Sequence, residues 1–212
     1  FSNKELRSMI ITLFFYLLLV MLVGIVDTFV VSSCGEAAVS GVSLVNQFNT
    51  IFIYLFTALA SGGAIIVSQY IGNKDEKRTV LSSSQLLMFS IVFSIVLSIL
   101  VLIFNKQLLG LLFGKVESDV MKACVTYLRI SAYSYPALAI YNAGAALYRS
   151  MAKTKVTMYI SFAANIINVV GNIIGVYVLK AGVAGVAYPS LISRVFSAIF
   201  ITVLCFNKKF LC

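Results

Sequence analysis

The chain has 212 residues, of which 61% are hydrophobic and 11% are charged, and its formal net charge is +9. A soluble globular domain carries roughly 25% charged residues, and a soluble core of this size could not bury so much apolar surface. These proportions exclude an ordinary soluble domain and indicate a protein that lies in a lipid bilayer.

Six apolar runs are each long enough to cross a bilayer, which takes about 20 residues in a helix. They cover residues 9–32, 47–71, 82–105, 124–148, 156–179 and 183–206. We therefore predict an all-α membrane protein in which residues 1–212 form one bundle of six transmembrane helices. Ser90, Ser94 and Ser98 fall on one face of the third run, where helix packing is the favoured explanation.

The positions of the basic residues predict the orientation of this bundle. One side of the alternating topology holds Lys4, Arg7, Lys74, Lys77, Arg78, Arg149, Lys153, Lys155, Lys208 and Lys209. The other side holds Glu36, Lys106, Lys115, Glu117, Asp119, Lys122 and Lys180. The positive-inside rule places both termini in the cytoplasm of a multi-pass cell-membrane protein. The charge thus reports topology, with some contact to anionic lipid, and gives no reason to expect a nucleic-acid partner.

Residue types that are absent or scattered limit the chemistry. The sequence contains no His, which removes the common zinc ligands and the Ser-His pair of an intramembrane protease. Cys34, Cys124, Cys205 and Cys212 have no CxxC spacing, so we interpret them as small membrane residues. We predict neither an enzyme nor a bound cofactor.

Asp27 is the one acidic residue inside an apolar run. A carboxylate at membrane depth is costly and by default marks a functional site. The alternative is a structural partner for an intramembrane base, Arg129 or Arg194. Because burial favours the uncharged form of a carboxylic acid, we expect Asp27 to load and release a proton and so to act as a coupling switch.

Depth in the membrane relates Asp27 to three other polar residues. A helix rises about 1.5 Å per residue, so Asp27 and Asn172 lie a few residues from the predicted outer ends of the first and fifth runs. Ser190 and Tyr127 lie near the outer starts of the sixth and fourth runs. Because each of these side chains needs a hydrogen-bond partner in lipid, a shared site is the economical hypothesis.

A polar stripe runs along the fifth span. Ser161, Asn165, Asn168 and Asn172 recur at spacings of four, three and four, which places them on one helical face. We favour the wall of a water-filled cavity over interhelical hydrogen bonding, which is the alternative. Carboxylate, amide and hydroxyl oxygens suit Na⁺ or a proton and not a soft metal, so the only metal ion we consider is Na⁺ at Asp27. Asn142, Asn165 and Ser161 are predicted to line a substrate cavity.

Four segments, in this order, resemble the amino-terminal half of the MATE (multidrug and toxic compound extrusion) transporters. They read GIVDTFVVSSCGEAAVSGVSLVNQF, SGGAIIVSQYIGNKDEKR, YLRISAYSYPALAIYNAGAALYRSMAKTKVTM and NIINVVGNIIGVYVLKAGVAGVAYPSLISR. The resemblance implies an antiporter that exports amphipathic, often cationic, small molecules against an inward flow of H⁺ or Na⁺. It also implies that the cation site of the family corresponds here to Asp27, Tyr127, Asn168, Asn172 and Ser190.

The family fold has two six-helix lobes with the substrate path between them. We therefore expect this chain to be one lobe of a longer transporter, or to pair with a second copy of itself. The other expected partners are the small-molecule substrate and membrane lipid.

The chain departs from the family pattern at three positions. Asn172 stands where many members have Asp, which weakens the case for Na⁺. Thr12 stands about four turns before Asp27, where some members have Pro. Pro189 precedes Ser190 where a small residue is usual, and we predict that it kinks the sixth run.

Two other functions remain open from the sequence. One is a lipid-linked oligosaccharide flippase of the same superfamily, for which Arg129 and Arg194 are the relevant intramembrane cations. The other is an inactive truncated lobe.

Overall fold

The structure is a computed structural model that describes residues 3–114, 116–151 and 153–206. Within those ranges the elements are α1 (Asn3–Ser32), α2 (Glu36–Gly72), α3 (Glu76–Phe113), α4 (Ser118–Tyr133), α5 (Tyr135–Ser150), α6 (Thr154–Ile173), the π-helix η1 (Ile174–Val178) and α7 (Ala184–Phe206). The predictions for Lys115, Lys208, Lys209 and Cys212 lie outside the described residues, as do the side chains of Lys4, Arg7 and Thr12.

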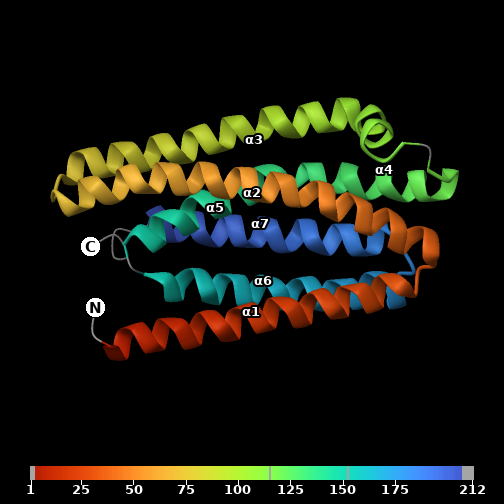
Figure 1. The fold of residues 1–212 in the computed structure, drawn as a ribbon, viewed down its shortest axis with the longest axis horizontal. Coiled ribbons are helices and arrows are strands. Elements are labelled where there is room, and N and C mark those ends of the chain that lie inside the picture. Colours follow the sequence, from red (N-terminus) through yellow and green to blue (C-terminus); the bar gives the residue numbers. More distant parts are fainter. Residues whose placement is uncertain (1–2, 115, 152, 207–212) are drawn as a thin grey trace.

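The long helices run roughly antiparallel, and α1 begins at the same end of the bundle at which α7 ends (Figure 1). The α2–α3 and α5–α6 connections also lie at this end, and the α1–α2, α3–α4 and α6–α7 connections lie at the opposite end. This is the alternation that the charge pattern predicts. The basic residues within 74–78, 149–151 and 153–155 therefore gather at the end where α1 begins and α7 ends.

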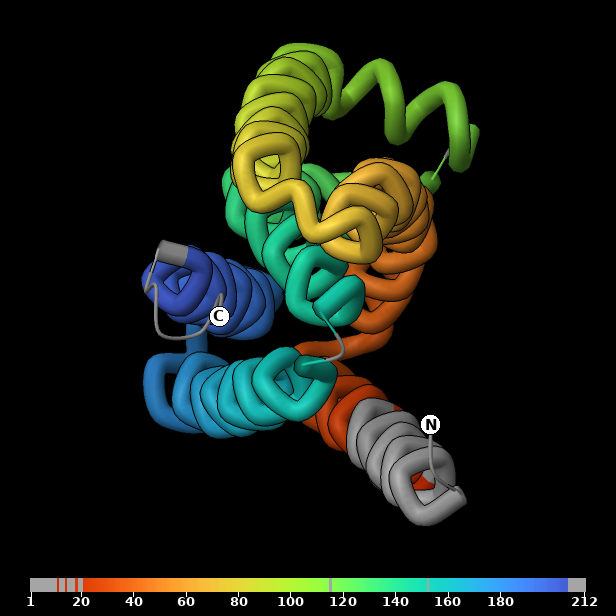
Figure 2. Tube along the Cα trace, turned by 90° about the vertical axis from the view of Figure 1, so that its left-hand side faces the viewer, coloured from red at the N-terminus to blue at the C-terminus, as the bar shows by residue number. Residues whose placement is uncertain are grey.

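The helices pack in two connected groups (Figure 2). α2, α3, α4 and α5 contact one another, α6 pairs with α7, and α7 joins the groups by packing on α4 and α5. α1 lies at the margin, where it contacts α6 and α2. The marginal position of α1 matters for the site, because α1 carries Asp27.

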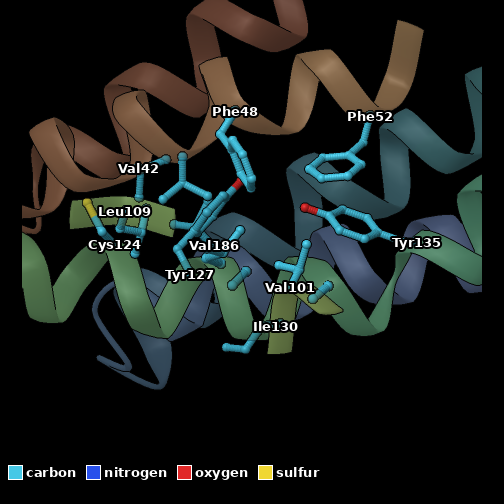
Figure 3. Close-up of a cluster of buried hydrophobic side chains, with 14 of the residues drawn as sticks. Val42, Phe48, Phe52, Val101, Leu109, Cys124, Tyr127, Ile130, Tyr135 and Val186 are labelled. Carbon is cyan, nitrogen blue, oxygen red and sulfur yellow. The ribbon is translucent and has the colours of Figure 1, made fainter. Parts of the chain in front are cut away.

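The main hydrophobic cluster centres on α2, α4 and the start of α5, and residues of α3 and α7 such as Leu109 and Val186 complete it (Figure 3). The ring of Phe52 stacks on that of Tyr135 with 4.8 Å between centroids, and Phe48 meets Phe52 edge to face at 5.0 Å. Large apolar side chains also cover the outer surface, as at Leu111, which is 85% exposed. Such an exterior is compatible with lipid and not with water.

Four helices in the described part of the chain are long and apolar enough to cross a membrane: Glu36–Gly72, Glu76–Phe113, Thr154–Val178 and Ala184–Cys205. α1 contributes a shorter apolar segment, Met21–Ser32. The all-α membrane fold is thus confirmed. Several helices extend beyond the predicted runs, because hydropathy marks only the apolar part of a helix. The helical geometry of α3 is interrupted at Phe104 (φ −101°, ψ 18°), close to the predicted end of the third run.

The fourth run, predicted as one helix over 124–148, is two helices that meet at Ser134. Pro136 explains the break, because proline has no N–H to donate to the carbonyl four residues earlier. That carbonyl belongs to Ala132, and the Ser98 hydroxyl of α3 donates to it at 2.6 Å. Ser90, Ser94 and Ser98 are all buried, so the helix face that carries them lies at a helix contact. Ser98 on this face also satisfies the backbone acceptor of Ala132.

Candidate functional site

A chain of hydrogen bonds joins three helices at Asp27. Asn172 Nδ2 of α6 donates to Asp27 Oδ1 of α1 at 2.6 Å and to Asn168 Oδ1 at 3.1 Å. Asn168 Nδ2 then donates to Ser190 Oγ of α7 at 3.0 Å. The structure therefore brings together four of the five residues predicted to hold a cation or proton. Asp27 makes no ion pair with Arg129 or Arg194 among the described residues.

Asn172 is the centre of this chain. Its side chain is fully buried, and its Oδ1 accepts no hydrogen bond from the described residues. Buried acceptors usually have a donor, so this oxygen is free to accept a proton carried by the acid or to ligate a hard cation. The amide of Asn172 thus donates a hydrogen bond to an ionised Asp27, and its oxygen can accept the proton or ligate the cation that neutralises Asp27.

A cavity of about 160 Å³ lies beside Asp27. It is lined by Gly24, Asp27, Thr28, Val31, Val39, Val42, Ser43, Asn46, Tyr127, Val186 and Ser190. At about 30 Å³ for each water in the liquid, this volume accommodates a small group of waters or a hydrated ion. Because Thr28, Ser43 and Asn46 are exposed, the cavity has a route to the surface between α1 and α2.

Tyr127, the fifth predicted residue, lines the same cavity, where its hydroxyl lies near Ser190 and also reaches α2. Its hydroxyl donates to Asn46 Oδ1 of α2 at 3.1 Å. Sequence reasoning missed Asn46 and Ser43, because the apolar run of the second helix begins at residue 47 and the residues before it were assigned to a polar break. Ser43 and Asn46 are three residues apart and lie just before that run. This helical spacing was the feature of the sequence that could have identified them.

Close backbone contact between α6, η1 and α7 sets the site's geometry. A Cβ on Gly175 would lie 2.1 Å from the carbonyl oxygen of Gly185, and one on Gly171 would lie 2.6 Å from Cβ of Pro189. Only glycine permits this approach, which lets Asn168 reach Ser190. The π-helix that follows Asn172 is a geometry often found at functional sites. Pro189 lies inside α7, which continues through it from Ala184 to Phe206.

The three residues predicted to line a substrate cavity have separate neighbours. Ser161 of α6 makes a hydrogen bond with the Tyr141 hydroxyl of α5. Asn142 donates to the Leu138 carbonyl at 3.0 Å on its own helix. Asn165 is half-buried, and no side-chain hydrogen bond links it to another described residue. Their role as a substrate wall therefore stays a prediction.

Comparison with known proteins agrees with this architecture. The family model named MatE matches residues 12–174. The uncharacterized transporter YisQ of Bacillus subtilis (strain 168) is 26% identical over 209 residues, which cover 97% of this chain and 45% of YisQ. The probable multidrug resistance protein YoeA of the same organism is 27% identical over 180 residues, covering 81% of this chain and 38% of YoeA. The chain thus spans less than half the length of these curated relatives.

Solved structures show the same fold. A multidrug resistance MATE family transporter in an outward-facing conformation superposes with a TM-score of 0.87 at 22% identity, covering 94% of this chain and 44% of the other. A MATE structure in the bent conformation gives a TM-score of 0.83 at 22% identity, with 90% and 42% covered. Since the family model covers most of the chain, and the helices and the apolar exterior agree with it, the chain belongs to the MatE family of membrane transporters.

Proposed function

We propose that this chain is the cation-coupling lobe of an antiporter in the cell membrane. The antiporter exports amphipathic or cationic small molecules while H⁺ or Na⁺ flows inward. The observation that carries the proposal is the contact of one carboxylate, Asp27, with the buried amide of Asn172, which neutral groups link through Asn168 to Ser190 of α7. An acid in an apolar segment, held by an amide and not by a base, is suited to exchange a cation.

The mechanism follows from the strength of the contact between Asp27 and Asn172. A hydrogen bond to an ionised carboxylate is roughly twice as strong as one between neutral groups. When Asp27 is ionised, Asn172 holds α1 firmly against α6. When a proton or Na⁺ neutralises Asp27, that attachment weakens. Because the described part of α1 contacts chiefly α6 and α2, at the margin of the bundle, α1 is the helix best placed to move in response.

The expected partner is a second six-helix lobe. The chain covers 45% of YisQ and 44% of the outward-facing transporter, which supports residues 1–212 acting as one of two lobes. A second copy of this chain is the alternative. In either arrangement the substrate passes between the two lobes.

The donor set favours H⁺ slightly over Na⁺. Asp27 supplies the only charge in the hydrogen-bonded chain, since the other members are amides and a hydroxyl. Hard oxygen ligands of this kind suit either ion. A single carboxylate binds a proton without further ligands, whereas Na⁺ needs several oxygens around it.

Dye efflux from cells that express the complete transporter tests the proposal, with Na⁺ and pH gradients varied separately. We expect efflux to follow one gradient in the wild type and to lose that dependence in Asp27→Asn, which keeps the size of the side chain. Asp119→Asn makes the same chemical change at an exposed surface pair with Lys122 and should behave as wild type. Gradient-driven efflux that persists unchanged in Asp27→Asn would refute the proposal.

A further inference from the structure

Asn46 is a polar residue of the cavity wall to which the coupling mechanism gives no role. It lies on α2, its side chain is exposed, and its Oδ1 accepts the hydrogen bond of the Tyr127 hydroxyl of α4 at 3.1 Å. Both residues line the cavity beside Asp27. The question is whether their contact holds two helices together or sets the chemistry of the cavity.

Other contacts already fix the register of α2 against α4. Toward the start of α2, a Cβ on Gly41 would lie 2.7 Å from Cβ of Ala123, so the two helices are in close contact there. Further along both helices, Asn49 Nδ2 donates to Ser131 Oγ at 3.2 Å. Because these contacts lie on either side of the tyrosine–asparagine bond, the helices stay aligned without it. The tyrosine ring is also held by burial, since the residue is only 5% exposed.

The contact determines where the Tyr127 hydroxyl proton points. A hydroxyl group has one proton to donate and two lone pairs with which to accept. Tyr127 donates to Asn46, and Ser190 Oγ, which lies near the Tyr127 hydroxyl, donates to the Val186 carbonyl at 3.2 Å. Both hydroxyl protons are therefore engaged by acceptors other than Asp27.

With both protons engaged, the site presents oxygen acceptors to a cation. The Asp27 carboxylate supplies the negative charge, and Asn172 Oδ1 accepts no hydrogen bond from the described residues. Tyr127 lies within electrostatic range of Asp27 and of Arg194, the charged groups that act on it from α1 and α7. An O–H that turned toward the ionised carboxylate would bind it strongly and would compete with the coupling ion.

We propose that Asn46 is a positioning residue of the coupling site. By accepting the Tyr127 proton, it keeps that proton on α2, so that Asp27 and the neighbouring oxygens bind the coupling ion without competition from it. This inference rests on the proposed ion-coupled export and adds α2 to the helices that control ion affinity. It requires that the loss of Asn46 acts through Tyr127.

Ion binding and dye efflux of the complete transporter test the proposal. The apparent dissociation constant of the ion is obtained from the rise in unfolding temperature with Na⁺ concentration or with acidification, and the part of this rise that Asp27→Asn abolishes reports the site. Efflux is measured in phosphatidylcholine vesicles over the same range of the driving ion.

The variants at Asn46 separate its acceptor from its bulk. Asn46→Leu removes the acceptor at similar size, and Asn46→Gln keeps an amide oxygen. The matched control is Gln47→Leu, which makes a similar polar-to-apolar change at the next residue of α2, also exposed and outside the lining of the cavity.

We expect Asn46→Leu to raise both the dissociation constant of the ion and the ion concentration for half-maximal efflux by about three- to tenfold. The dye concentration for half-maximal efflux should stay unchanged, whereas a structural fault would move it as well. Asn46→Gln should restore the ion requirement to within about twofold of wild type, and Gln47→Leu should leave it unchanged. In a Tyr127→Phe background, which lacks the hydroxyl proton, Asn46→Leu should have no further effect.

Three results would overturn the inference. Wild-type ion affinity in Asn46→Leu would show that the Tyr127 proton does not compete with the ion. An effect of Asn46→Leu that persists in the Tyr127→Phe background would show that Asn46 acts by another route. An equal loss in Gln47→Leu would show that the polarity of α2 matters and the contact does not. If the wild type binds the ion in an Asn46-dependent way but efflux follows no ion gradient, the inference stands and the proposed export function fails.

Discussion

Replacing Asn172 by Asp tests the central contact of the site. Asn172 Nδ2 lies 2.6 Å from Asp27 Oδ1, so a carboxylate oxygen in place of this nitrogen would face another ionised oxygen at the same distance. At an effective dielectric constant of 20 the repulsion of two unit charges at that separation is about 6 kcal/mol. A hydrogen bond to a charged group contributes only about 1.5–3 kcal/mol. The two carboxylates therefore cannot stay ionised in this geometry without a cation between them.

We expect Asn172→Asp to make transport responsive to Na⁺. In vesicles held at alkaline pH, where protons compete least, the Na⁺ concentration for half-maximal efflux should fall by at least about tenfold relative to wild type, since 6 kcal/mol of repulsion far exceeds the 1.4 kcal/mol that corresponds to tenfold. Asn165→Asp is the control, because it adds a carboxylate on the same helix at a residue with no bond to Asp27. An Asn172→Asp variant with the Na⁺ response of wild type, or one matched by Asn165→Asp, would show that the described contact is wrong.

Three further substitutions test the packing around the site, and the first two have a matched control. Gly185→Ala should lower the free energy of unfolding by about 1–3 kcal/mol in thermal denaturation, because the new Cβ meets the η1 backbone at 2.5 Å, whereas Gly62→Ala has nothing within 4 Å to meet. Tyr127→Phe should reduce gradient-driven efflux several-fold with a loss of only about 1 kcal/mol in stability, and the same change at the exposed Tyr133 should affect neither. Ser98→Ala should cost about 1–3 kcal/mol of stability without altering ion dependence, since it leaves a buried α4 carbonyl unsatisfied.

The sequence predicted the layer of polar residues because two simple constraints act on it. The fixed rise of a helix sets the depth of each residue, and lipid offers no hydrogen-bond partner. Together they were enough to group Asp27, Asn172 and Ser190, which the structure joins through Asn168. The same constraints grouped Tyr127 with these residues, and it lines the cavity beside Asp27, although its hydroxyl also bonds to Asn46, which was not foreseen.

Other features could not be read from hydropathy. A break such as that between α4 and α5 is invisible to a window average, because the residues around Pro136 are as apolar as those of a continuous helix. The contact between Gly175 and Gly185 depends on the path of the α6–α7 connection, which no local pattern specifies. Asn46 was missed for a related reason: a helix can continue beyond its apolar part and still contribute to a buried site.

The central claim is that Asp27 carries the ion exchanged for substrate. The most direct measurement is the number of protons or Na⁺ ions released when a transported dye binds to the purified complete transporter, by calorimetry in buffers of different ionisation enthalpy and with a Na⁺ indicator. We predict release of up to one ion in the wild type and none in Asp27→Asn. Equal release from both proteins would contradict the account, because the exchanged ion would then be bound at another residue.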